Sequence, residues 1–223
     1  MCGRYSLGRT DRFDWGAFGV APDAGLVPRW NIAPGTDVLA VRVGNAGRES
    51  AMLRWGLVPG WSRDASMGRR LANARAESAH EKPMFRAAFA SRRCLLPADG
   101  FYEWQQLPGE KRKQPWRIER ARGGSLALGA VWERWRGPDG VAIESCAILT
   151  VAANAALSHI HDRMPVIIAT ADMPDWLSPT VAVTTAHALC VPAPDDLLAT
   201  WRISTAVNVP GRDDASVAAP VEP

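Results

Sequence analysis

The chain has 223 residues, of which 47% are hydrophobic and 22% are charged. This balance is typical of a folded globular protein and excludes a wholly disordered chain, a collagen and a coiled coil. The net charge of +3 conceals an asymmetry, because residues 1–120 hold 20 basic and 12 acidic side chains whereas residues 121–223 hold 6 and 11. A basic, tryptophan-containing first half favours a polyanionic partner, although 23 arginines against three lysines also suit a GC-rich genome.

Strand-like runs rich in Val, Ile, Leu and Trp recur along the chain and are bounded by Gly, Pro or Asp. In chain order they are Val38–Val43, Ser50–Val58, Cys94–Ala98, Phe101–Gln105, Trp116–Glu119, Leu126–Trp135, Val141–Val151 and Val166–Thr170. Helical patterns are fewer and shorter, and they are Arg69–His80, Lys82–Ser91, Asn154–Ile160, Asp172–Leu177 and Asp195–Ile203. Many strands without strict βαβ alternation predict the α+β class, with one domain over residues 1–209. The Ala-, Pro- and Asp-rich segment 210–223 is predicted to be a disordered tail.

The four cysteines lie far apart and form neither a CxxC pair nor a Cys/His zinc spacing, so we expect no metal and no cofactor. Cys94 and Cys146 stand in apolar runs and are expected to be buried thiols of a reducing cytosol. The chain has no signal-peptide core and no run of about 18 uncharged apolar residues. We therefore expect a cytoplasmic protein that does not cross a membrane.

Cys2 follows the initiator methionine, which is removed when the second residue is small, so the mature chain is expected to begin with Cys2. Its α-amine, with a pKa of about 7.7–8.0, and its thiol, near roughly 8.5, then belong to one residue. Such a 1,2-aminothiol condenses with an aldehyde to an imine, and its thiol then closes onto the same carbon as a five-membered thiazolidine. The same residue could instead be the nucleophile of an N-terminal-nucleophile hydrolase, or have no role.

Two later segments carry candidate proton-transfer groups. In PADGFYEW, strand alternation places Glu103 on the same side as Phe101. If that side is buried, the pKa of Glu103 rises and suits general acid–base chemistry; a solvent-exposed side is the alternative. In SHIHDRMP, His159 or His161 could move protons near pH 7.

The helical pattern Arg69–His80 contains the segment NARAES. On a helix, Asn73 and Glu77 would share one face while Arg75 points elsewhere. An ordinary solvated helix face explains Glu77 equally well.

Tryptophans of the first half stand close to Gly, Pro or Asn and among arginines. Aromatic faces near loops, together with arginines, are what single-stranded nucleic acid needs for base stacking and phosphate contacts. We expect Trp61 and Trp104 to be exposed for this purpose, and Trp132 and Trp135 to belong to the core.

Six segments, MCGRY, WNIAPG, RWGLVPGW, NARAES, RRCLLPADGFYEW and IHDRMPVII, occur in this order. Together they resemble the SRAP domain, the SOS response-associated peptidase family of abasic-site processing proteins, from Cys2 to about Val209. The resemblance implies a compact α+β domain with curved, mainly antiparallel β-sheets around a cleft and short flanking helices. It also implies a monomer that binds single-stranded DNA with abasic sites, including junctions with duplex DNA, and that is nucleoid-associated when bound.

The resemblance further implies a role for each matching position. Cys2 would form the thiazolidine with the ring-opened aldehyde of an abasic deoxyribose, and Asn73 would hydrogen-bond near the sugar and the Cys2 amine. Glu103 would assist ring opening, imine formation and crosslink reversal, and His161 rather than His159 would move protons at the sugar hydroxyl. Phosphate ligands would be Arg4, Arg75 and Arg163, and the residues that stack or wedge against bases would be Pro34, Trp61 and Trp104. The word peptidase implies autoproteolytic removal of the residue before Cys2.

Two other classes compete with this interpretation. A glutamine amidotransferase also opens with Met-Cys-Gly, but its chain usually continues with an apolar residue and Gly where this one has Arg4 and Tyr5. The chain is also short for a glutaminase joined to a synthase domain. A non-catalytic nucleic-acid-binding module, in which Cys2 is incidental, is the third class.

Overall fold

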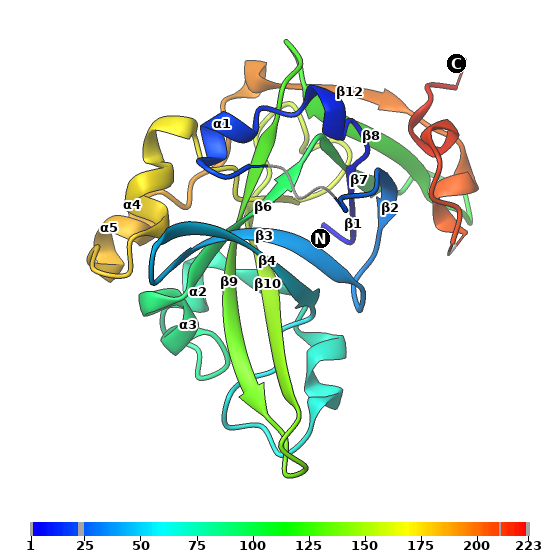
Figure 1. Cartoon of the computed structure of the whole chain (residues 1–223). Coiled ribbons are helices and arrows are strands. Elements are labelled where there is room, and N and C mark those ends of the chain that lie inside the picture. The colour runs from blue at the N-terminus through cyan, green and yellow to red at the C-terminus, as the bar shows by residue number, and fades with distance from the viewer. Residues whose placement is uncertain (1, 22–24, 210, 222–223) are drawn as a thin grey trace.

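A computed structural model describes residues 2–21, 25–209 and 211–221 (Figure 1). The strands are β1 (Arg4–Leu7), β2 (Arg29–Ile32), β3 (Asp37–Gly44), β4 (Gly47–Trp55), β5 (Asn73–Arg75), β6 (Arg93–Ala98), β7 (Gly100–Gln105), β8 (Gln114–Arg120), β9 (Leu126–Arg136), β10 (Ala142–Ala152), β11 (Arg163–Pro165) and β12 (Leu198–Arg202). The α-helices are α1 (Trp15–Phe18), α2 (Ala76–Ala79), α3 (Arg86–Ser91), α4 (Met173–Leu177) and α5 (Val183–Ala188). Short 3₁₀ turns lie between them, among them Ala65–Arg70, Thr205–Asn208 and Ala215–Ala218.

The strands form two sheets. One has the order β12-β8-β7-β1-β2, and the other has the order β11-β10-β4-β3-β6-β9, with β5 beside β10. Because β9 also pairs with β10, the second sheet closes on itself as a small barrel. Among the described strands, only β10 with β4 and β10 with β5 pair in parallel, so the expected α+β class with mainly antiparallel sheets is confirmed.

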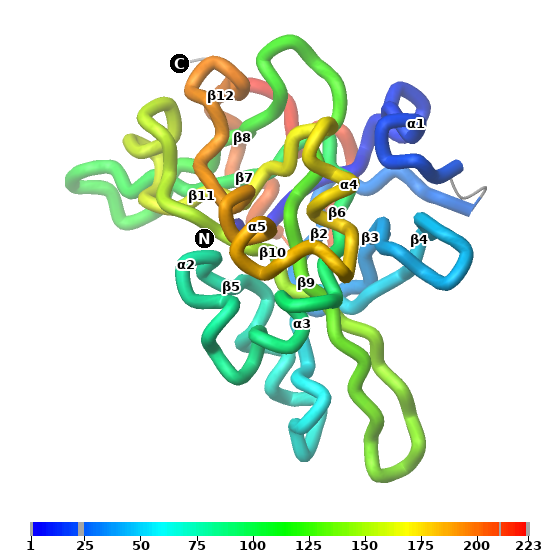
Figure 2. The backbone as a smooth tube through the Cα atoms, turned by 90° about the vertical axis from the view of Figure 1, so that its left-hand side faces the viewer, coloured from blue at the N-terminus to red at the C-terminus, as the bar shows by residue number. Residues whose placement is uncertain are grey.

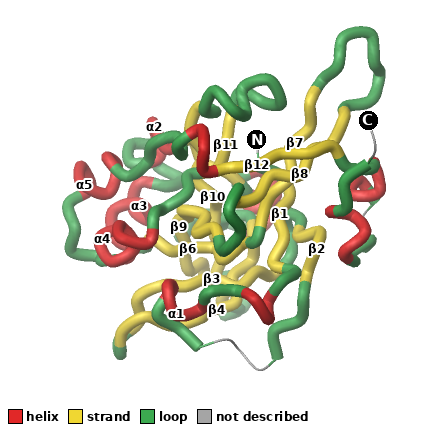
Figure 3. Tube along the Cα trace, turned by 90° about the horizontal axis from the view of Figure 1, so that it is seen from above, coloured by secondary structure: helices red, strands yellow, loops and turns green. Residues whose placement is uncertain are grey.

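The core lies inside the barrel and between the two sheets. Leu95, Leu128 and Ile148 are fully buried, as the apolar runs of the sequence predict. The ring of Tyr5 on β1 meets the ring of Trp55 on β4 edge-on at 5.4 Å and so joins the two sheets. Viewed from above, α2–α5 gather on one side of the sheets and the last 3₁₀ turns lie on the opposite side (Figure 3).

The prediction of a helix at Arg69–His80 is wrong. Its residues form the end of a 3₁₀ turn, then β5, then the single turn α2. β5 adds to the barrel beside β10, where Asn73 is the partner of Ile148, and this pairing outweighs the local helix propensity. Asn73 and Glu77 therefore do not share a helix face.

Three other expectations differ from the structure. The segment 195–203 is mostly strand β12, because Leu198–Arg202 pairs with residues 116–120 of β8. The segment 154–160 forms hydrogen-bonded turns, and the strand expected at 166–170 is replaced by β11 and a single bridge at Ile167. Each of these short elements depends on a distant partner that local propensity does not contain.

The expected disordered tail, 210–223, also differs from the structure over residues 211–221. Asp213 accepts hydrogen bonds from the backbone N–H groups of Trp30 and Asn31 on β2. Val217 is fully buried against Tyr102, and the Trp201 indole donates to the Ala218 carbonyl at 3.1 Å. A few apolar residues are enough to hold this segment in place, because each one packs into a site on the outer face of the first sheet.

Candidate functional site

Cys2 lies just before β1, where its backbone is held by β5. The Asn73 side-chain amide donates to the Cys2 carbonyl oxygen at 2.8 Å. The Trp55 indole fixes the approach to β5 by donating to the Ala72 carbonyl at 2.8 Å. The Cys2 thiol is fully buried and donates to the Arg4 carbonyl oxygen at an Sγ–O distance of 3.9 Å. The strand pairing of β5 with β10 thus brings Asn73 to Cys2 across 71 positions of sequence.

Glu103 lies on β7, the antiparallel neighbour of β1, in a register that pairs Arg4 with Tyr102. Only 3% of Glu103 is exposed, so the buried alternative for this side of the strand is the observed one. Burial raises the pKa of Glu103 to about 7. Burial, with the nearby Glu103 charge adding to it, raises the pKa of the Cys2 thiol well above its usual range. At neutral pH the carboxyl is therefore poised between its two forms while the thiol keeps its proton.

His161 precedes β11, and its Nδ1 accepts the backbone N–H of Arg163 at 3.0 Å. The Asp162 carboxylate also lies 2.8 Å from Nδ1, a contact that is an ion pair only when the ring is protonated. Burial lowers the pKa of His161, so at neutral pH the ring is neutral and the bond from Arg163 prevails. This assigns the ring proton to Nε2. His159 instead packs against the Trp116 ring at 5.5 Å.

A cavity of about 670 Å³ lies beside the start of β1. Arg4, Pro34 and Trp104 line it together, although they come from three distant segments. Within the described residues the Arg4 guanidinium has no hydrogen-bond or ion-pair partner, and partial burial lowers its pKa. The cavity has room for a small ligand such as a nucleotide, and its free guanidinium favours an anionic one. Sequence reasoning missed two further lining residues, Arg29 and Asp213.

The remaining predicted DNA contacts lie apart from this cavity. Arg163 on β11 is engaged by Glu77, with Nη–Oε distances of 2.6 and 2.8 Å, and donates to the Thr150 carbonyl at 2.6 Å. Arg75 is exposed on β5. Trp61 is 59% exposed, with its indole N–H 3.3 Å from the Pro83 carbonyl, and it does not line the cavity that Trp104 lines.

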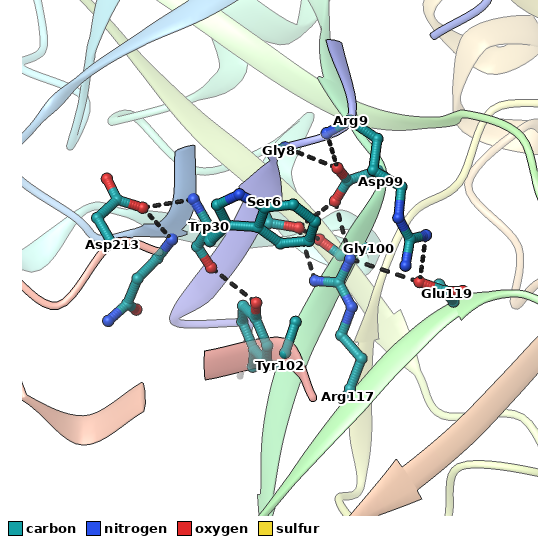
Figure 4. Close-up of polar contacts among 12 residues, drawn as sticks. Ser6, Gly8, Arg9, Trp30, Asp99, Gly100, Tyr102, Arg117, Glu119 and Asp213 are labelled. Carbon is teal, nitrogen blue, oxygen red and sulfur yellow. Dashed lines mark hydrogen bonds and ion pairs between the residues drawn. The ribbon is translucent and has the colours of Figure 1, made fainter. Parts of the chain in front are cut away.

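A buried polar network behind β1 was not foreseen from the sequence (Figure 4). Asp99 accepts hydrogen bonds from the Ser6 hydroxyl, the Arg117 guanidinium and the backbone N–H groups of Gly8 and Arg9. Arg117 is fully buried, donates to Ser6 at 2.6 Å and lies over the Tyr102 ring at 4.9 Å. The network fixes β1 against β7 and β8, and so fixes the strand that begins at Cys2. Strand alternation groups Arg117 with Glu119 on the face opposite Ile118, which is typical of a solvated face, so no local pattern predicted this burial.

Figure 2 shows β5, α2 and β11 on the same side of the molecule, where β5 and β11 flank β10. In the part of the chain that the structure describes, no His, Cys, Asp and Glu side chains form a cluster of three able to hold a metal ion. No helix among the described residues has the length and apolarity to cross a membrane.

The fold and site define a class: a small β-rich protein whose second residue is a cysteine, held by an asparagine and placed beside a buried glutamate. The family model described as SOS response associated peptidase (SRAP) matches residues 1–210, and the chain belongs to this family. It is 35% identical to the abasic site processing protein YoaM of Bacillus subtilis over 97% of each chain. It is 32% identical to the abasic site processing protein YedK of Escherichia coli, covering 86% of this chain and 88% of that one. A crystal structure of a Bacteroides thetaiotaomicron protein shares the fold with a TM-score of 0.88 at 21% identity, covering 99% of this chain and 100% of that one.

Proposed function

We propose that the protein binds single-stranded DNA containing an abasic site and, after removal of Met1, joins it covalently through a thiazolidine at Cys2. The observation that carries this proposal is the position of Cys2, with its carbonyl bonded to Asn73 and its thiol within the field of the buried Glu103. The names of the relatives, abasic site processing proteins, support the choice of substrate.

The chemistry follows from the state of each group. The open-chain sugar presents an aldehyde, and the neutral Cys2 α-amine adds to it to give a carbinolamine. Glu103 in its protonated form donates a proton to the hydroxyl that leaves as water, which gives the iminium ion and the Glu103 carboxylate. The thiol sulfur then adds to the C=N carbon, so that a C–S bond forms, the nitrogen keeps its hydrogen, and the thiol proton passes to the carboxylate and restores its protonated form. A carboxyl group with a pKa of about 7 can both donate and accept a proton at neutral pH.

The other predicted residues prepare the substrate. Asn73 holds the Cys2 backbone, and His161, whose ring proton is assigned to Nε2, would move a proton at a sugar oxygen as the ring opens. Arg4, Arg75 and Arg163 would bind phosphates of the strand, and Pro34, Trp61 and Trp104 would contact bases, including those at a junction with duplex DNA. We expect the protein to act as a monomer and to remove the residue before Cys2 by autoproteolysis.

The test is a denaturing gel of purified protein incubated with a single-stranded oligonucleotide that carries one abasic site. A slower, heat-resistant band is expected from the wild type and no such band from Cys2→Ala. Cys2→Ser is the matched control, since it keeps an α-amine and a similar volume but gives a less stable ring. The proposal would be falsified if Cys2→Ala gave as much crosslink as the wild type.

A further inference from the structure

A second cavity, of about 460 Å³, shares one wall with the cavity of Arg4 and Pro34. Its lining residues are Trp104, Arg112, Lys113, Thr205, Asn208 and Val209. Trp104 is common to both cavities. The indole therefore stands between two hollows, and a strand that occupies both must pass around it.

The second cavity carries unpaired positive charge. Arg112 and Lys113 lie in the exposed loop between β7 and β8, and neither forms an ion pair or side-chain hydrogen bond with any residue the structure describes. None of the residues lining the cavity is acidic. Two adjacent cations without protein partners at the edge of a hollow suit a phosphate group.

The charge of Lys113 also acts on the candidate proton-transfer groups. Burial is the main cause of the pKa shifts of both Glu103 and His161, and the Lys113 ammonium acts on both groups as well, lowering each pKa.

The wall between the cavities is held in one orientation. The Trp104 indole N–H donates to the Asn208 side-chain oxygen at 2.7 Å. That bond leaves the Asn208 side-chain N–H groups for an external acceptor, since no described residue accepts them. A fixed indole beside an amide donor resembles the stacking and polar contacts that a single nucleotide requires.

We propose that the second cavity binds one nucleotide flanking the lesion, with its phosphate on Arg112 and Lys113 and its base against Trp104, while the Arg4 cavity holds the strand on the opposite side. The inference rests on the proposed function for the identity of the strand. It adds a second phosphate site, and it assigns each cavity to the DNA on one side of the lesion, either the 5′ or the 3′ side.

The test compares Arg112→Ala/Lys113→Ala with the wild type in binding to oligonucleotides that carry a tetrahydrofuran abasic analogue, which has no aldehyde and cannot crosslink. Three oligonucleotides are used, with a 5′ flank only, a 3′ flank only, and both. The double variant is expected to bind one single-flank oligonucleotide about tenfold more weakly and the other with unchanged affinity. Its log–log salt slope on the two-flank oligonucleotide should fall by about 1.4, which is two single-strand phosphate contacts of about 0.7 each.

Arg122→Ala/Arg136→Ala is the matched control, because it removes the same charge from exposed positions outside both cavities. Equal losses on the two single-flank oligonucleotides, or a loss no larger than that of the control, would overturn the inference. Arg112→Lys/Lys113→Arg should restore wild-type binding, which separates lost charge from a disturbed loop. The tetrahydrofuran oligonucleotides measure binding without crosslinking. A failure of the Cys2 chemistry would therefore appear only in the denaturing-gel experiment and would not affect the binding measurement.

Discussion

Two buried carboxyl groups, Asp99 between β6 and β7 and Glu103 within β7, behave in opposite ways. Burial alone would raise the pKa of Asp99, but the Arg117 guanidinium, the Ser6 hydroxyl and the Arg9 N–H outweigh it and hold that pKa below its usual range. Burial dominates at Glu103, whose pKa rises to about 7. Four positions of sequence therefore separate a permanently ionised group from one that titrates at neutral pH.

The difference lies in the balance between burial and the neighbouring groups at each carboxyl. Arg117 reaches Asp99 at 2.8 Å from β8 and neutralises it, which makes the pair part of the scaffold. Glu103 is instead placed beside a cysteine, in a region where a charged form is costly. A carboxyl group whose pKa lies near the working pH is suited to moving protons, whereas a neutralised one is suited to fixing a strand.

Removing Arg117 should have the largest effect, because it turns Asp99 into an unpaired buried charge. Arg117→Met is expected to lower the free energy of unfolding by about 3 to 5 kcal/mol, measured by urea denaturation at pH 7. Asp99→Asn/Arg117→Met should recover part of that loss, since neither charge is then left alone. Arg122→Ala, an exposed arginine, serves as the control with a change under about 0.5 kcal/mol. A loss below about 1 kcal/mol for Arg117→Met would contradict the structural role of the pair.

Replacing Glu103 with a neutral residue should raise the free energy of unfolding above neutral pH, which is the opposite of the loss expected for Arg117→Met. The folded pKa of about 7 exceeds the ordinary value of 4.5, so the stability that the protonated form contributes is complete below about pH 4.5 and is lost as the pH rises through 7. At pH 8 the cost of ionisation is about 3 kcal/mol, and Glu103→Gln should recover it.

The measurement is the free energy of unfolding of both proteins at pH 5 and pH 8. The two should be similar at pH 5 and diverge at pH 8, with Glu103→Gln the more stable. A constant difference between them across this range would mean that Glu103 is already ionised at pH 5. Glu110→Gln, at an exposed position in the loop between β7 and β8, is a suitable control for the removal of a carboxylate.

The contrast between the two groups also marks how far sequence reasoning extends. The long strands were predictable, because apolar runs are local patterns, and strand alternation placed Glu103 on the side of Phe101 but left open whether that side is buried. The ion pair of Asp99 and Arg117 was not predictable, because the two side chains meet only when β1, β7 and β8 lie side by side. Asn73 was selected by resemblance, but its contact with Cys2 depends on β5 pairing with β10 rather than on the expected helix.

The tail shows the same dependence on distant partners. Its composition suggested disorder, yet Asp213 finds two backbone N–H groups on β2 and Val217 finds a buried place beside Tyr102. Local composition cannot reveal such sites, since the partners lie 182 and 183 positions earlier for Asp213 and 115 positions earlier for Val217.

A third carboxylate, Glu77, extends the comparison to a surface pair and should give the smallest effect. It is 53% exposed and binds Arg163 with both oxygens, and this hydrogen bonding keeps its pKa below the usual range. If Arg163 binds a DNA phosphate, Glu77 competes with that phosphate for the same guanidinium. Glu77→Gln should then raise the affinity for a single-stranded abasic analogue by about two- to fivefold at low salt, the equivalent of one exposed ion pair. The gain should shrink as salt screens the pair, and it should be absent when Arg163→Gln is combined with Glu77→Gln. Weaker binding by Glu77→Gln would show instead that Glu77 positions Arg163 for the phosphate, which is the reverse of competition.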